Sequence, residues 1–204
     1  MNTYTFFITS FIIILIPGTG VIYTISVGVS KGKKASILAA FGCTAGIIPH
    51  LCISIALSSL LVKMSSSAFT IIKLLGALYL LYLGVGMMLS KTKLKLENAK
   101  LENNPVPIVC RGILINLLNP KLTLFFFSFL PQYVNSNGKN YVIESLTYGL
   151  AFMILTLIVF MGYGILGGTA KKLIISSPKR INLLQKFFGI IFIVFAVQLA
   201  LSPF

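Results

Sequence analysis

The chain has 204 residues, of which 57% are hydrophobic and only 10% are charged, and its mean hydropathy is +0.98. A soluble domain of this length could not shield that much apolar surface from water, so the composition predicts an integral membrane protein. The net charge of +14 could suit nucleic acid. However, the basic residues lie mainly between apolar segments, where lipid head groups explain them better, and we expect no nucleic-acid partner.

Six apolar segments are long enough to cross about 30 Å of hydrocarbon, which takes about 20 helical residues. The N-terminus lacks the basic region of a signal peptide, so the first segment is expected to remain as a transmembrane helix. We therefore predict an all-α integral membrane protein with one transmembrane domain over residues 1–204. The segments cover about residues 4–26, 36–62, 68–90, 110–131, 142–166 and 184–203.

The first segment is interrupted in its middle by Pro17, Gly18, Thr19 and Gly20. A proline inside a helix has no amide hydrogen, so it frees the carbonyl four residues earlier, here that of Ile13. Unpaired backbone groups are costly in hydrocarbon and must face protein, water or a ligand. A helix that restarts after a break also presents free amide groups, which suit a carboxylate. The alternative is a proline kink that only shapes packing.

His50, the only histidine, follows Pro49 in the middle of the second segment. It could carry a proton near neutral pH, or it could pack as a neutral, hydrogen-bonded side chain. Gly42 and Gly46 in the same segment form a GxxxG pattern, which favours close packing against another helix. Such a surface permits a homodimer without requiring one.

The fourth segment has a matching break at Asn119 and Pro120, which frees the carbonyl of Asn116. Lys121 follows, roughly 15 Å from the nearer end of the segment, and a charge at that depth is a functional candidate. We expect Lys121 to bind a substrate carboxylate or to carry a proton; the alternative is that it only reaches a wet cavity along the break. Asn116 and Asn119 could hydrogen-bond a substrate, or they could only satisfy the backbone opened by Pro120.

The segments divide into two halves of three, about 1–90 and 108–204, joined by a polar linker over about 91–107. Lysine and arginine concentrate in the first, third and fifth connections, which predicts that these are cytoplasmic and that both termini face outward. Because three is an odd number, the halves must have opposite orientations. Interrupted first helices in two inverted halves are typical of the midplane site of a transporter. "KLLGALYLLYLG" and "KFFGIIFIVFAV", in the third and sixth segments, add a second internal similarity.

No aspartate occurs, and the three glutamates fall in or beside the connections. The chain also lacks clustered metal ligands, a nucleotide-binding loop and a nucleophile with a nearby base. We therefore predict no metal, no cofactor and no enzymatic activity.

Three stretches together resemble the lysine exporter and homoserine–threonine efflux (LysE/RhtB-type) family of amino-acid exporters, over nearly the whole chain. The resemblance implies a bacterial inner-membrane secondary exporter driven by the proton motive force. Pro17-Gly18 matches the PG of the family, His50 its second-helix histidine, and Asn119-Pro120-Lys121 its NPK. Many members read PGP followed by Asp, Asn or Gly, whereas Thr19 and Gly20 follow Pro17-Gly18 here. The stretches are "PGTGVIYTISVGVSKGKKASILAAFGCTAGIIPH", "FTIIKLLGALYLLYLG", in which Gly76, Tyr79 and Gly84 match, and "RGILINLLNPKLTLFFFSFLPQYV".

A cationic substrate side chain in this core would meet Lys121 and no carboxylate. We therefore predict export of a neutral amino acid, such as threonine, homoserine or a branched-chain residue. The alternatives are a passive channel, an exporter of another small solute such as a metal ion, and a structural membrane protein.

Overall fold

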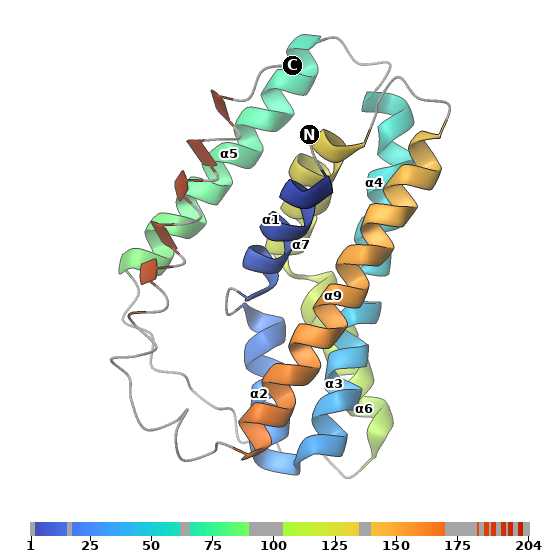
Figure 1. Ribbon diagram of the computed structural model, residues 1–204, viewed down its shortest axis with the longest axis vertical. Coiled ribbons are helices and arrows are strands. Elements are labelled where there is room, and N and C mark those ends of the chain that lie inside the picture. Colours follow the sequence, from blue (N-terminus) through green and yellow to red (C-terminus); the bar gives the residue numbers. More distant parts are fainter. Residues whose placement is uncertain are drawn as a thin grey trace. The chain divides into compact units, whose positions relative to one another are not determined.

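The computed structural model describes residues 3–15, 18–61, 66–89, 104–134 and 140–169, and short pieces between 183 and 201 (Figure 1). Every element in these ranges is helical, as the composition predicts. Contacts divide the chain into two compact units. One unit comprises Met1–Leu57 and Lys95–Ile175, and the other comprises Ser58–Leu94 and Ser176–Phe204.

Two bent helix pairs occupy the positions of the first and fourth predicted segments. In the first pair, α1 (Thr3–Leu15) and α2 (Thr19–Lys31) meet at 55°. In the second pair, α6 (Pro105–Leu117) meets the stretch Pro120–Tyr133 at 54°. That stretch consists of α7 (Pro120–Leu124), the π-helix η1 (Phe125–Phe129) and α8 (Leu130–Tyr133). The helices are therefore interrupted at both predicted places.

The second pair begins earlier than the sequence suggested, at Pro105 rather than near residue 110. The side chain of Asn104 caps α6 by accepting a hydrogen bond from the amide of Val106. Proline is tolerated in the first helical turn, because the amide it lacks has no partner within the helix there. The proline that would otherwise mark a linker thus starts the helix.

The described residues do not account for all six predicted spans. Among the described residues, Lys33–Ala56 and Tyr141–Gly167 are long and apolar enough to cross a membrane, and the two bent pairs raise the number to at most four. The first of these contains α3 (Lys33–Ala45) and most of α4 (Ile48–Leu61), and the second lies in α9 (Tyr141–Thr169). In the other unit, α5 (Ser66–Leu89) covers the third predicted segment. The count of six and the inverted halves stay predictions.

Helices of the first unit pack closely because glycines face neighbouring backbones. α3 packs against α2, α6 and α9, while α9 also runs along α1 and α2 (Figure 1). A Cβ at Gly46 would lie 2.5 Å from the carbonyl oxygen of Ile113, and one at Gly112 would lie 2.9 Å from the amide of Cys43. Small residues at such contacts let backbones approach. The GxxxG pattern of Gly42 and Gly46 is therefore used against α6 of the same chain.

Two backbone details join these helices. Gly32 turns the chain sharply between α2 and α3 with a φ of 87°, a conformation that side chains disfavour. Between α3 and α4, the amide of Ile47 bonds to the carbonyl of Thr44 rather than to that of Cys43. The bond to Thr44 leaves the carbonyl of Cys43 available to another partner. The sequence analysis did not predict this joint between α3 and α4.

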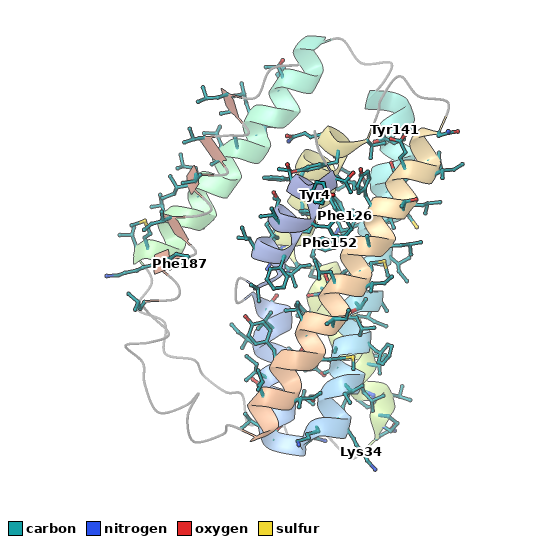
Figure 2. The ribbon with its side chains drawn as sticks, viewed as in Figure 1. Tyr4, Lys34, Phe126, Tyr141, Phe152 and Phe187 are labelled. Atoms are coloured by element: carbon teal, nitrogen blue, oxygen red, sulfur yellow. The ribbon has the colours of Figure 1, made fainter. Side chains whose placement is uncertain are left out.

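Aromatic rings fill the core where α1, η1 and α9 meet. Phe152 stacks on Phe125 with centroids 4.1 Å apart and meets Phe126 edge-on at 5.5 Å (Figure 2). Phe6 of α1 joins Phe125 at 6.3 Å. The side chain of Ser54 donates to the carbonyl of Phe126 at 2.7 Å, which satisfies backbone that the π-helix distorts. This cluster ties α1, the first half of one bent pair, and η1, in the second half of the other, to α9.

In the second unit, Gly189 lies against α5. A Cβ there would approach the carbonyl oxygen of Gly84 and the side chain of Met88 to 2.8 Å. Gly84 is one of the positions that the family resemblance singled out. The surroundings of the other two, Gly76 and Tyr79, are not among those that the structure describes. The basic connections after residue 89 and after residue 169, on which most of the orientation prediction rests, also lie outside the described residues.

Candidate functional site

The two helix breaks border one small cavity in the first unit. Its volume is about 10 Å³, roughly the space of one water molecule. Five of the predicted substrate-binding residues line it: Gly18, Gly20, Asn116, Asn119 and Lys121. The remaining lining consists of Ile13, Ile14, Val21, Leu122, Phe152, Thr156 and Phe160.

Lys121 connects the two breaks. Its ammonium donates a hydrogen bond to the carbonyl of Ile13, with Nζ and O 3.0 Å apart. This is the carbonyl that loses its helical partner because residue 17 is a proline. A Cβ at Gly18 would lie 3.3 Å from the same Nζ, so the lysine packs against the start of α2. A positively charged group from the second bent pair thus lies at the break of the first.

The end of α1 receives a second donor from α9. The hydroxyl of Tyr163 donates to the carbonyl of Leu15 at 2.9 Å. Helix ends leave up to four carbonyls without helical partners, and such groups are costly away from water. Tyr163 and Lys121 together therefore stabilise an interruption that lies in an apolar environment.

His50 adds a contact at the second break, where the carbonyl of Asn116 already accepts a hydrogen bond from the amide of Asn119. Its Nε2 lies 3.1 Å from the carbonyl oxygen of Asn116, the group predicted to be freed by Pro120. Its Nδ1 lies 3.4 Å from the hydroxyl of Thr123, which in turn lies 3.5 Å from the carbonyl of Asn119. His50 is 5% exposed and does not line the cavity. It instead contacts the backbone of Asn116, a residue that does line the cavity.

This arrangement can satisfy His50 in two charge states. With Nε2 donating to Asn116, a neutral ring accepts from the hydroxyl of Thr123 through Nδ1. With a second proton, Nδ1 donates to Thr123, and that hydroxyl can turn to the carbonyl of Asn119. Either state keeps both ring nitrogens hydrogen-bonded.

The side chains of Asn116 and Asn119 hydrogen-bond to backbone groups, and both residues also line the cavity. The amide nitrogen of Asn116 donates to the carbonyl of Cys43 at 2.8 Å, the group left over at the joint between α3 and α4. The side-chain oxygen of Asn119 accepts from the amide of Lys121 at 3.1 Å and so caps α7. Its amide nitrogen lies 3.5 Å from the side-chain oxygen of Asn116. The backbone role that the sequence left open is therefore present for both residues.

The other predicted residues lie elsewhere. Thr19 is exposed and is absent from the cavity wall, and Pro120 is exposed at the first position of α7. Pro17 lies outside the described residues. Among the described residues, no group of three His, Cys, Asp or Glu side chains could hold a metal ion.

Sequence reasoning missed the contribution of α9. Phe152, Thr156 and Phe160 recur every four residues and so lie on one face of the helix. The usable signal was a threonine at this spacing within a stretch that is otherwise apolar. Thr156 is 1% exposed, and its hydroxyl donates to the carbonyl of Phe152 at 2.8 Å.

Comparison with known proteins finds relatives over nearly the whole chain. Residues 11–203 match the LysE type translocator family. The leucine efflux protein of Klebsiella pneumoniae is 29% identical over 208 aligned positions, covering 98% of this chain and 95% of the relative. The leucine efflux protein of Enterobacter sp. (strain 638) has the same identity and coverage. No solved structure matches the chain. Because the family match extends over nearly all of it, the chain belongs to the LysE type translocator family.

Proposed function

We propose that the protein is a secondary active exporter that moves neutral amino acids out of the bacterial cytoplasm across the inner membrane, driven by protons. The observation that carries the proposal is the ammonium of Lys121, which lies at a cavity between two interrupted helices. Family membership supports transport, and the names of the two leucine efflux relatives support an amino acid as the substrate.

A zwitterionic amino acid suits the pair of Lys121 and Ile13. Its carboxylate replaces the carbonyl of Ile13 as the partner of the ammonium, which exchanges a neutral acceptor for a charged one. Its ammonium group then takes over the released carbonyl of Ile13. One substrate molecule therefore satisfies both members of the pair. The first amides of α2 add donors beside the carboxylate, because Gly18 has no side chain that could cap that helix.

The same cavity argues against a cationic substrate side chain. Its charged lining residue is Lys121, and no carboxylate belongs to the wall. Lysine or arginine would bring a second positive charge close to Lys121 in a poorly hydrated site, which costs free energy. Neutral amino acids avoid this repulsion.

Transport requires the site to open. A cavity with room for about one water molecule cannot hold an amino acid, so binding must separate some of the surrounding helices. The two bends provide natural hinges, since each interrupts the helix at the cavity. We infer an alternating-access cycle in which the halves of each bent pair move relative to α3 and α9.

Several features support two inverted halves, with both termini on the outer side. The two bends have almost the same angle, 55° and 54°. The bent pair of each proposed half packs against the second helix of the other half, α6 on α3 and α2 on α9. Three lysines, Lys31, Lys33 and Lys34, cluster at the corner between α2 and α3, as expected for a cytoplasmic connection.

Purified protein in liposomes tests the proposal. We expect vesicles with an imposed pH difference to accumulate leucine or threonine against a gradient, and to transport lysine much more slowly. Lys121→Ala should abolish uptake, whereas Lys34→Ala, which removes an exposed lysine at the start of α3, should not. Equilibration without accumulation would indicate a passive channel, and a strong preference for lysine would contradict the substrate class.

A further inference from the structure

Three side chains of α9 line the cavity and take no part in backbone satisfaction at the breaks. Phe152, Thr156 and Phe160 are 1%, 1% and 5% exposed and are spaced by four residues. They therefore present two aromatic rings with a smaller side chain one helical turn from each. We call this set the α9 wall.

Both rings of the α9 wall are held in place by their neighbours. Phe152 is stacked on Phe125 and packed edge-on against Phe126, inside the aromatic cluster (Figure 2). Phe160 lies against the backbone of α2, since a Cβ at Gly20 would come within 2.8 Å of its ring. Two rings fixed in this way cannot easily move together to fill the space over the smaller residue.

Thr156 lines that space as the smallest of the three side chains. Its hydroxyl proton is committed to the carbonyl of Phe152 in its own helix, so it has no proton left to donate to a substrate. A hydroxyl on the substrate side chain would find one acceptor here, the Thr156 oxygen, and no donor, so its burial would be only partly compensated, which costs free energy. An aliphatic side chain incurs no such cost.

We propose that the α9 wall is the side-chain subsite of the exporter and that Thr156 sets the largest side chain that fits. This inference rests on the proposed function and narrows it, favouring branched aliphatic amino acids over threonine and homoserine. The polar groups of the cavity, Lys121 and Ile13, hold the main-chain charges of the substrate. The substrate side chain then meets the apolar part of the wall, which comprises the α9 wall together with Ile14, Val21 and Leu122.

The test measures counterflow of leucine, phenylalanine and alanine into liposomes that contain the purified protein. Thr156→Ala should raise the ratio of kcat/KM for phenylalanine over leucine roughly tenfold, because pocket size discriminates by about that factor per methylene or more. Thr156→Leu should lower the leucine-to-alanine ratio by a similar factor. Thr156→Val keeps the shape and should retain leucine transport while lowering any residual threonine transport.

Thr147→Ala is the matched control. Thr147 lies on the same helix and makes the same kind of bond, from its hydroxyl to the carbonyl of Ile143 at 2.8 Å, but it is exposed and away from the cavity. Its ratios should equal those of the wild type. If wild-type protein transports amino acids while the Thr156 variants change all substrates by one factor, the subsite is refuted and the proposed function stands. If wild-type protein transports no amino acid, both are refuted.

Discussion

Lys121 Nζ and the carbonyl oxygen of Ile13 lie 3.0 Å apart, although the two residues are 108 positions apart in the chain. The bond joins the break of one bent pair to the break of the other. Its reciprocal is the contact of His50 Nε2 with the carbonyl of Asn116. At each break, a side chain from the other proposed half thus contacts the carbonyl that the proline was predicted to free, although that of Asn116 also accepts from the amide of Asn119.

Removing the ammonium should affect both stability and transport. Lys121→Ala leaves the carbonyl of Ile13 without this donor, which should lower the free energy of unfolding by about 1–3 kcal/mol. We expect export to fall by about two orders of magnitude or more, since the variant lacks the ammonium that is proposed to bind the substrate carboxylate. Lys121→Arg keeps the charge with a larger, planar group in a cavity of about 10 Å³, and it should recover stability better than export. Counterflow in liposomes and thermal unfolding in detergent measure the two effects. An alanine variant that transports at the wild-type rate would contradict the assignment.

A substitution at His50 should distinguish proton coupling from substrate transport. His50→Gln retains an amide that can donate to the carbonyl of Asn116 but cannot take up a proton. We expect this variant to exchange amino acids across the membrane yet to lose accumulation driven by a pH difference. The comparison is counterflow against pH-driven uptake in the same vesicles. Undiminished pH-driven accumulation would exclude His50 as the proton carrier.

Gly20 should tolerate no side chain. A Cβ there would lie 2.5 Å from the side-chain oxygen of Asn116 and 2.8 Å from the ring of Phe160. Overpacking of this kind typically costs about 1–3 kcal/mol, so Gly20→Ala should lower the unfolding temperature and reduce export. Gly162→Ala is the control, because a Cβ there meets nothing within 4 Å and alanine favours the helix. If both variants unfold at the wild-type temperature, the packing around Gly20 is looser than the structure indicates.

Asn119 allows capping to be distinguished from substrate binding. Serine is also a good helix cap, so Asn119→Ser should keep stability within a few tenths of a kcal/mol. It removes the amide that lies 3.5 Å from Asn116, and we expect export to drop about tenfold. Asn119→Ala, which loses the cap as well, should be less stable by about 1 kcal/mol. Full export activity in the serine variant would assign Asn119 to capping alone.

The helix breaks were predictable because their cause is covalent. A proline has no amide hydrogen wherever it lies, so the carbonyls of Ile13 and Asn116 could be identified from the positions of Pro17 and Pro120 alone. The need for a partner followed from the apolar surroundings. Which side chains would supply the partners did not follow, because Lys121 and His50 reach those carbonyls across contacts between distant segments.

The α9 wall and the π-helix at Phe125–Phe129 were missed for a different reason. In a membrane protein both the lipid-facing and the buried sides of a helix are apolar, so periodicity does not distinguish the face that lines a cavity. The stretch "FFFSF" is apolar in any helical register. Only the packing of α1 and α9 around it determines where its backbone changes.

The bond between Lys121 and Ile13 has a further consequence for the timing of the cycle. An exporter must return to its inward-facing state with an empty site, and a bare ammonium at that depth would slow the return. During this step the carbonyl of Ile13 can stay hydrogen-bonded to the ammonium of Lys121, in the place that the substrate carboxylate would otherwise take. The speed of the empty return, and with it the maximal export rate, should therefore depend on a backbone group that no side-chain substitution at residue 13 can remove.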